Sequence, residues 1–384
     1  MINKKYEESI KLHKKYGGKL GVVTKVPLKN KKDLSLAYTP GVAGVCLAIA
    51  KDPKQALEYT IKKNTVAIVS DGSAILGLGN LGPLAAIPVM EGKACIFKDF
   101  GKVDAFPICI HTQNTEEIIE LVKQISPVFG GINLEDISAP RCFEIEERLR
   151  RELDIPVMHD DQWGAATVGL AALINALKLA KIKKENVKVV IAGVGAAGVA
   201  TGRLLHSYGI TNTIFCDSKG IINKKRTDLT KEKKELLKGS TLKERTGTLA
   251  DALIDVDVFI GLSQPKTLTE EMIKSMNRKP IIFTLANPTP EIMPEEALKA
   301  GAFIVATGRS DYPNQINNSL MFPNAFRAML DYKIPQFKNE IFTTIAVALA
   351  NVIKTPTKEN IIPNMFDKKA GRAVYKAVAS LAKK

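Results

Sequence analysis

Aromatic side chains are scarce in this chain of 384 residues, where they make up 6% and include a single Trp. The formal net charge is +15, and lysines concentrate in residues 1–32 and 219–245, which hold few aromatic residues. Single-stranded nucleic acid is bound on a platform of aromatic rings on which its bases stack, and neither stretch supplies one. We therefore interpret both stretches as solvated faces and expect no nucleic-acid partner.

Cysteine, histidine and long apolar runs are also in short supply. The five cysteines are odd in number and lack CxxC spacing, which predicts reduced core thiols. The four histidines are scattered, which argues against a histidine-rich zinc site. No apolar run approaches the roughly 18 residues of a membrane-spanning helix, and the start "MINKKYEESIKLHKKYGG" lacks the apolar centre of a signal peptide. We expect a cytoplasmic protein with no membrane partner.

The length and the order of apolar segments predict two α/β domains. A chain of 384 residues exceeds the size at which one hydrophobic core usually stops growing. From residue 61 to about 158, short apolar runs alternate with helical stretches, which indicates α/β layers. Beyond that point, four apolar strands separated by helices are typical of a doubly wound, Rossmann-like parallel sheet, and helices follow to the C-terminus. We place the domains at 1–158 and 159–384.

A glycine motif in the second domain predicts a dinucleotide site. Gly193, Gly195 and Gly198 form GxGxxG directly after the strand "VKVVIA" and before a helix, so the backbone there can approach a pyrophosphate. Asp217 closes the next strand, where an acid hydrogen-bonds an adenosine ribose. The candidate cofactor-binding residues are Gly193, Gly195, Ala196, Ala197, Gly198, Asp217, Ser218 and Lys219.

The same region bears on the coenzyme. Asp217 favours NAD because it repels a 2′-phosphate, whereas Lys219, Lys224 and Lys225 are placed to receive one. We expect NAD to be used, with NADP also possible. A second GxGxxG, residues 77–82, does not follow a strand directly, and we interpret it as a tight passage of backbone beside a ligand or metal, or as a close helix contact.

Two acidic stretches predict a metal site. "VMHDDQWGAATVGL" places Asp160 and Asp161 at a helix start, where capping needs only one of them. "GGINLEDISAP" adds Glu135 and Asp136 after an apparent strand end. Three carboxylates from two loops form the oxygen site that Mg²⁺ or Mn²⁺ prefers. Helix capping and a solvated loop are the structural alternatives.

Two further residues are candidates for proton transfer. Lys93 in "PVMEGKACIF" and Tyr38 in "AYTPGVAGV" both lie in mostly apolar surroundings. A buried lysine whose pKa is lowered acts as a base near neutral pH. A loop cation and a core aromatic are the alternative interpretations.

Together these motifs resemble the small-subunit malic enzymes over residues 15 to 335. They are YTPGVA, SDGSAILGLGNLG, EGKA, NLEDISAP, HDDQWG, GVGAAG, ANPTP and QINNSLMFP, in family order. The resemblance implies a homodimer that converts (S)-malate to pyruvate and CO₂ with NAD(P) and a divalent metal. Residues 1–158 would form the substrate and metal domain, and residues 159–384 the NAD(P)-binding domain with a helical tail.

The resemblance also assigns roles to residues. Tyr38 is implied to be the general acid and Lys93 the general base, with Asp160 orienting the base. The implied metal ligands are Glu135, Asp136 and Asp161, and the implied substrate residues are Asn287, Asn317 and Asn318.

The chain departs from the family pattern at three positions. Ala74 stands where large-subunit relatives carry an arginine, so the substrate carboxylate needs another cation, for example from a neighbouring subunit. Trp163 and Ala165 replace a histidine and a threonine found in many small relatives, which alters the pocket. The alternatives are a hydroxy-acid dehydrogenase without decarboxylation, a basic nucleic-acid-binding module and a catalytically inactive relative.

Overall fold

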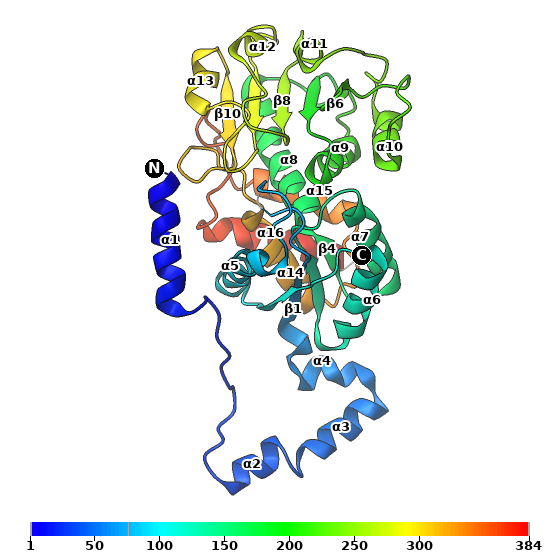
Figure 1. Ribbon diagram of the computed structural model, residues 1–384, viewed down its shortest axis with the longest axis vertical. Helices are drawn as coiled ribbons and strands as arrows, with labels where there is room; N and C mark the ends of the chain where they lie inside the picture. Colours follow the sequence, from blue (N-terminus) through cyan, green and yellow to red (C-terminus); the bar gives the residue numbers. More distant parts are fainter. Residues whose placement is uncertain (1, 76, 383–384) are drawn as a thin grey trace.

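The computed structural model describes residues 2–75 and 77–382. Figure 1 shows an α/β body built around two sheets, with the first helices of the chain standing away from it. The predicted fold class is confirmed. The predicted domain boundary between residues 158 and 159 falls within the last strand of the first sheet, Val157–His159, just before a long helix begins at Asp160, and the division into two domains stays a prediction. Residues 383 and 384 of the predicted second domain lie outside the described part of the chain.

The first sheet is parallel, with strand order β2-β1-β3-β4. The inner strand β1 (Thr65–Ser70) is buried along its whole length, which agrees with its mostly apolar sequence. The strands are β1 (Thr65–Ser70), β2 (Asp104–Cys109), β3 (Gly131–Leu134) and β4 (Val157–His159), and the helices between them are α5 (Pro83–Gly101), α6 (Thr115–Ile125) and α7 (Arg141–Glu152).

The second sheet has the order β10-β9-β8-β5-β6-β7, and β7 is its antiparallel edge strand. The strands are β5 (Val189–Ala192), β6 (Thr213–Asp217), β7 (Gly220–Ile221), β8 (Val258–Gly261), β9 (Ile281–Thr284) and β10 (Ile304–Thr307). The helices are α8 (Asp160–Ala180), α9 (Ala196–Tyr208), α10 (Lys231–Gly239), α11 (Leu249–Leu253), α12 (Glu270–Lys274) and α13 (Pro294–Lys299).

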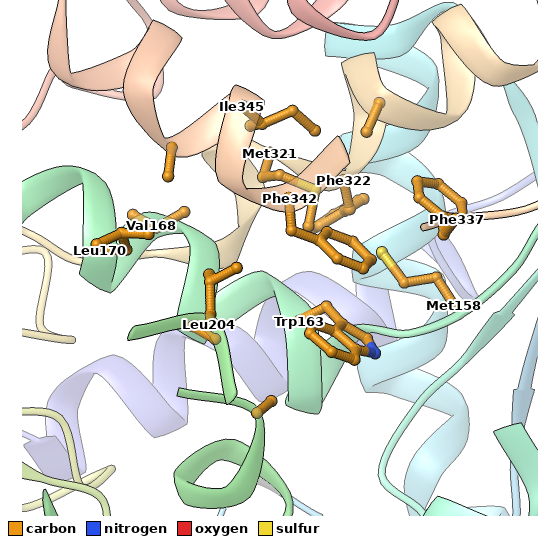
Figure 2. Packing of buried hydrophobic residues seen from close by; sticks show 14 of the residues in the cluster. Met158, Trp163, Val168, Leu170, Leu204, Met321, Phe322, Phe337, Phe342 and Ile345 are labelled. Atoms are coloured by element: carbon orange, nitrogen blue, oxygen red, sulfur yellow. The ribbon is translucent and has the colours of Figure 1, made fainter. Parts of the chain in front are cut away.

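The C-terminal helices connect the two halves. They are α14 (Phe322–Asp331), α15 (Asn339–Ala350) and α16 (Lys368–Ala382). Phe322 and Phe326 of α14 pack on Phe97 of α5, with ring centroids 4.8 and 5.5 Å apart. Phe342 of α15 stacks on Trp163 of α8 at 4.5 Å (Figure 2). The helical tail therefore packs against the first domain as well as the second, and one hydrophobic cluster runs through both.

The N-terminal segment is the least covered part of the described chain. It contains α1 (Ile2–Tyr16), α2 (Lys31–Ala37), α3 (Val42–Lys51) and α4 (Ala56–Tyr59), with short 3₁₀ turns at Pro53–Gln55 and Ile61–Asn64. Lys19, after α1, donates its backbone N–H to Glu91 of α5 at 3.2 Å. Between this contact and β1 lies a largely helical segment, residues 20–64, which we call the N-terminal arm. No described residue of α2 or α3 is buried, and both helices lie apart from the sheets in Figure 1.

Two sequence expectations need correction. Residues 31–51 and 160–180 are both long and apolar enough to cross a membrane by length and composition, although no such run was expected. Residues 160–180 are α8, which is mostly buried in the core, and a core helix passes the same test. Residues 31–51 are exposed and are divided by a turn into α2 and α3. All five cysteines are free, but Cys46 in α3 is exposed and is not a core thiol.

Candidate active site

The acidic residues converge because β1, β3 and β4 are parallel neighbours. Their carboxyl ends meet at the same edge of the sheet, where open α/β sheets place their ligands. Glu135 and Asp136 follow β3, and Asp160 and Asp161 follow β4. Glu135, Asp136 and Asp161 each offer a carboxylate oxygen, and these oxygens lie within 4.8 Å of one another.

Local backbone geometry holds this cluster together. Asp136 has φ of 53°, in the left-handed region that aspartate tolerates better than most residues. Its N–H donates to Oδ2 of Asp161 at 2.8 Å, and its carbonyl accepts from the N–H of Ala74 at 2.9 Å. The loop that contains Ala74 therefore contacts the carboxylate cluster directly.

The cluster fits a divalent cation. Glu135 and Asp136 are buried, and burial raises the pKa of Glu135 well above its ordinary value, although the charge of Lys93 opposes this. Three closely spaced carboxylates repel one another, and a bound Mg²⁺ or Mn²⁺ would compensate this charge with its preferred oxygen ligands. The donor set and its spacing thus agree with the predicted metal ligands.

Lys93 lies between two carboxylates. It projects from α5, is 7% exposed, and its Nζ is 2.6 Å from Glu135 and in contact with Oδ2 of Asp160. Burial lowers the pKa of Lys93, but Asp160 and Glu135 outweigh burial and raise the pKa above its ordinary value. The sequence interpretation assumed a lowered pKa, and it is wrong for this arrangement because it counted burial without the two carboxylates.

Asp160 joins the lysine to the C-terminal half of the chain. Its carboxylate is fully buried and accepts hydrogen bonds from Lys93 and from the side-chain amide of Asn318. Burial raises the pKa of Asp160, whereas Lys93 opposes the rise. Asn318 begins the 3₁₀ turn Asn318–Leu320. Three predicted residues from distant parts of the sequence therefore meet in one network.

Glu146 is a functional candidate that the sequence analysis missed. Its buried carboxylate in α7 accepts from the N–H of His159 at 2.9 Å and from the side chains of Gln162 and Trp163 at 3.0 Å each. These bonds anchor the start of α8, which bears Asp160 and Asp161. The available signal was helical spacing, because Glu146 comes four residues after Cys142 and three before Leu149, on the face that these apolar residues share. Trp163, one of the departures from the family pattern, is accommodated by its hydrogen bond to Glu146 and by stacking on Phe342.

Arg141 is the second residue that the sequence analysis missed. Its guanidinium lies 2.9 Å from Asp71 and donates to Ser73 at 3.0 Å, next to Ala74. It also donates to Ser138 at 3.0 Å. Because these bonds engage the guanidinium, Arg141 supports the loop rather than replacing the arginine that is missing at Ala74.

The other predicted substrate residues are placed differently from Asn318. Asn287 follows β9, and a Cβ built on Gly77 would lie 2.3 Å from its carbonyl oxygen. Gly77, with φ of 73°, therefore serves a close passage of backbone, as the sequence predicts for the 77–82 glycines. The side chain of Asn317 accepts from the N–H of Ser319 at 2.9 Å, so it caps the 3₁₀ turn.

The predicted dinucleotide turn has the expected form. β5 ends at Ala192, Gly193 has φ of 97°, and α9 begins at Ala196. A Cβ on Gly198 would lie 1.9 Å from the carbonyl oxygen of Gly193, whereas a Cβ on Gly195 would meet no described atom within 4 Å. The first glycine shapes the turn, Gly198 permits close packing, and Gly195 faces open space. The first N–H groups of α9, at Ala196 and Ala197, are thus available to a phosphate.

Asp217 closes β6 as predicted, but it is not an isolated carboxylate. Arg226 and Lys233 donate to it, and so does the N–H of Lys219, which follows Ser218 in the turn before β7. Burial raises the pKa of Asp217, but Arg226 and Lys233 outweigh burial and lower it to about 2.

Tyr38 is the predicted residue that a single chain does not bring to the site. It ends α2 on the N-terminal arm and is 67% exposed. Figure 1 shows α2 far from α5, which bears Lys93. Its predicted role stays a prediction.

Comparisons with known proteins agree with this geometry. Residues 17–118 and 111–150 match the family "Malic enzyme, N-terminal domain", and residues 163–382 match "Malic enzyme, NAD binding domain". The bifunctional malic/malolactic enzyme of Bacillus subtilis is 50% identical over 98% of this chain and 92% of its own length. The NAD-dependent malic enzyme of Geobacillus stearothermophilus is 52% identical over 95% of this chain and 77% of its own length.

Solved structures agree as well. The crystal structure of the NAD-dependent malic enzyme of Thermotoga maritima has a TM-score of 0.94 and 48% identity, and the match covers 96% of this chain and 98% of that one. Other matched relatives are named NADP-dependent malic enzymes.

Proposed function

Because this chain belongs to the malic enzyme family, and so is an NAD- or NADP-dependent malate oxidoreductase, we propose that it also decarboxylates its substrate, so that (S)-malate becomes pyruvate and CO₂. The observation that carries this proposal is Lys93 in contact with Asp160 and Glu135, beside three clustered carboxylates. Oxidation of a hydroxy acid needs a base and a coenzyme. The carboxylate cluster is unnecessary for it and points to the additional step.

The proton transfers are assigned to residues of the cluster. Lys93 takes the proton of the C2 hydroxyl as hydride leaves C2 for the coenzyme, and for this step it must be the neutral amine. Asp160 favours the ammonium form of Lys93, but burial raises the pKa of Asp160 itself, so the two groups can share one proton and the amine is neutral when Asp160 holds that proton. Asn318 fixes the orientation of Asp160 from the other side.

Glu135, Asp136 and Asp161 would hold Mg²⁺ or Mn²⁺. When bound, such a cation would supply Lewis-acid polarisation of the C2 oxygen, which favours breakage of the bond between C3 and its carboxylate. Glu135 would link the cation site to the proposed base, because its carboxylate also contacts Lys93. The turn at residues 193–198 would hold the coenzyme pyrophosphate.

The experiment that tests this function is a product balance. Purified protein is given (S)-malate, Mn²⁺ and each coenzyme in turn, and reduced coenzyme, pyruvate and CO₂ are measured together. We expect equal amounts of all three. A dehydrogenase without decarboxylation would yield oxaloacetate and reduced coenzyme with no CO₂, and an inactive relative would yield none of the products.

We further propose that the protein is a homodimer in which the N-terminal arm covers a second copy. The arm exposes large apolar side chains, and a solvated monomer rarely exposes a contiguous apolar surface of this kind. They include Leu34, Leu36, Val42, Val45 and Leu47. The arm contacts the body near its two ends, through an ion pair of 3.8 Å between Lys25 and Asp104 and through hydrogen bonds from Lys62 to the carbonyls of Ser126 and Phe129. Its helices α2 and α3 extend away between these contacts.

The incomplete site is a second reason to propose that the N-terminal arm contacts a second copy of the chain. The proposed acid, Tyr38, lies on the arm, whereas Lys93 lies in the body, so neither site is complete within one chain. In a twofold dimer each arm would reach the other body, and both sites would be completed together. Tyr38 of one chain would then protonate C3 to form pyruvate in the site of the other.

A cytoplasmic location is also proposed. All five cysteines are free, which agrees with a reducing compartment. We expect no nucleic-acid partner, because the lysine-rich stretches 1–32 and 219–245 hold few aromatic residues on which bases could stack. We expect no membrane partner, because the arm's apolar surface is assigned to the second copy.

A further inference from the structure

The ribose end of the proposed coenzyme site differs from the sequence expectation. A carboxylate has about four lone-pair positions, and in Asp217 four donors occupy them. Oδ1 accepts from Arg226 at 2.7 Å and from the N–H of Lys219 at 3.0 Å. Oδ2 accepts from Arg226 at 2.9 Å and from Lys233 at 2.7 Å. A ribose hydroxyl therefore finds no unused acceptor on Asp217.

The charge around Asp217 is positive rather than negative. Arg226 also donates to Asp228 at 2.9 and 2.8 Å, and Lys219 lies 2.8 Å from the same carboxylate. Three cations thus face two carboxylates. Asp217 and Arg226 are both largely buried, so solvent screens this network less than a surface pair.

A basic hollow continues from Arg226. Its volume is about 290 Å³, and of the described residues that line it none is acidic. The cations in its lining are Lys224, Arg226, Lys234, Lys238 and Lys243. Only Lys224 is engaged by a nearby acid, Glu244 at 2.8 Å, among the ion pairs of these lysines that the structure describes. An anionic group beside Arg226 would meet the cations of this hollow, whose described lining does not include Asp217.

We propose that Arg226 and Lys233 determine the coenzyme preference of this chain. They cancel the charge of Asp217, which would otherwise repel a 2′-phosphate. Because the hydrogen bonds of Arg226 and Lys233 already go to Asp217 and Asp228, the two cations act through their charge, and the lysines of the basic hollow that have no described ion pair are left to contact the phosphate. The chain accordingly accepts NADP as readily as NAD. This inference rests on the proposed function, because it assumes that the adenosine ribose lies at the end of β6.

The test measures binding of two nucleotides that are not turned over. Full-length protein is titrated calorimetrically with AMP and with adenosine 2′,5′-bisphosphate, which differ by the 2′-phosphate alone. We expect the wild-type protein to bind the bisphosphate at least as tightly as AMP. Arg226→Gln and Lys233→Met should each weaken the bisphosphate relative to AMP by about tenfold, since each removes a positive charge that offsets Asp217. Asp217→Asn should shift the ratio the other way.

The matched control is Arg203→Gln. Arg203 in α9 forms an ion pair of 2.8 Å with Glu235 in α10, in the same domain but outside the Asp217 network. This variant should leave the ratio of the two dissociation constants unchanged. Thermal unfolding checks that each variant is folded, and Lys233→Met tests the proposal if Arg226→Gln is not.

Three results would overturn the proposal. The first is a wild-type protein that binds AMP more than about tenfold more tightly than the bisphosphate. The second is an unchanged ratio in folded Arg226→Gln and Lys233→Met, which refutes the role of these cations and leaves the proposed reaction intact. The third is failure of both nucleotides to bind, which also removes the placement of the coenzyme.

Discussion

Lys93 illustrates how the charge state of a single residue depends on its neighbours. The side chain is buried under the ring of Phe322, whose centroid is 4.3 Å from Nζ, and its two carboxylate contacts favour the ammonium form. Glu135 belongs to the proposed metal site, so a bound cation would withdraw part of its negative charge from Lys93. Asp160 then remains as the partner that holds the lysine in position and shares its proton.

Lys93→Ala should reduce the rate of malate oxidation by about 10² to 10⁴, the usual contribution of a general base. Small primary amines should restore part of the rate, because they enter the vacated space and accept the same proton. The measurement is the initial rate of coenzyme reduction with and without added amine.

Lys98→Ala is the control for this variant. Lys98 lies on the same helix but is exposed and paired with Asp104 at 2.6 Å, so its loss should leave the rate within about twofold of the parent. If folded Lys93→Ala oxidises malate at the parent rate, Lys93 is not the base.

At the scale of secondary-structure elements, two junctions between a strand and the following helix supply most of the proposed site. The turn after β5 offers backbone N–H groups, and the junction after β4 offers carboxylates at the start of α8. Both lie at carboxyl ends of parallel strands, where side chains and N–H groups are left free of the sheet's own hydrogen bonds. The loop after β3 completes the second junction.

Substitutions of the two glycines in the coenzyme turn should have different effects, one on the stability of the fold and the other on coenzyme binding. Gly198→Ala places a Cβ 1.9 Å from a carbonyl oxygen and should destabilise the protein by about 1 to 3 kcal/mol. Gly195→Ala meets no described atom, so its thermal unfolding should match the parent, while its methyl group obstructs the pyrophosphate and weakens coenzyme binding about tenfold or more. Calorimetry and thermal unfolding measure the two effects. Equal coenzyme affinity in Gly195→Ala and the parent would contradict the placement of the pyrophosphate.

If the residues after β3 and β4 hold one metal ion, both turnover and the unfolding temperature should depend on that ion. EDTA should abolish turnover, and Mn²⁺ should restore it and raise the unfolding temperature, because a ligand at about 100 times its Kd stabilises the folded state by roughly 2.7 kcal/mol. Asp161→Asn removes one ligand charge and should lose the Mn²⁺-induced rise. Glu147→Gln, at an exposed acid of α7, should retain it. A normal Mn²⁺-induced rise in Asp161→Asn would exclude this residue as a ligand.

At the scale of the whole molecule, the C-terminal helices pack against the body, whereas the helices α2 and α3 of the N-terminal arm do not. α14 and α15 pack their aromatic residues against α5 and α8, so the chain's own tail covers these helices. The arm covers none of the described body with α2 or α3 and leaves their apolar faces exposed. A second copy of the chain would cover these faces and would also complete the site by supplying Tyr38.

Mixing two inactive variants tests whether the site is shared. Tyr38→Phe and Lys93→Ala should each be nearly inactive alone, but a mixed dimer has one site in which both residues are intact. Random mixing of the chains should therefore restore roughly a quarter of the parent activity. Light scattering at the assay concentration verifies the dimer. If mixing restores no activity although mixed dimers form, Tyr38 does not act across the interface, and a fully active monomer would reject the dimer itself.

The sequence by itself determined the local parts of this protein. The glycine turn after an apolar strand, the acidic pair at a helix start and four strands of the second sheet depend on neighbours along the chain and were predicted from it, whereas β7 and β10 of that sheet were not. The tertiary structure decided which of these parts meet. Asn318 reaches Asp160 across 158 positions, and Lys93 reaches it across 67.

The tertiary structure also decided the charge states of the site residues. The raised pKa of Lys93 and the lowered pKa of Asp217 arise from carboxylates and cations that packing brings within hydrogen-bonding distance. Such contacts depend on strand order and helix packing, which spacing in the sequence does not specify. The position of Tyr38 on an exposed arm has the same origin, since a residue's distance from a site in the same chain is set by the folded path of the backbone.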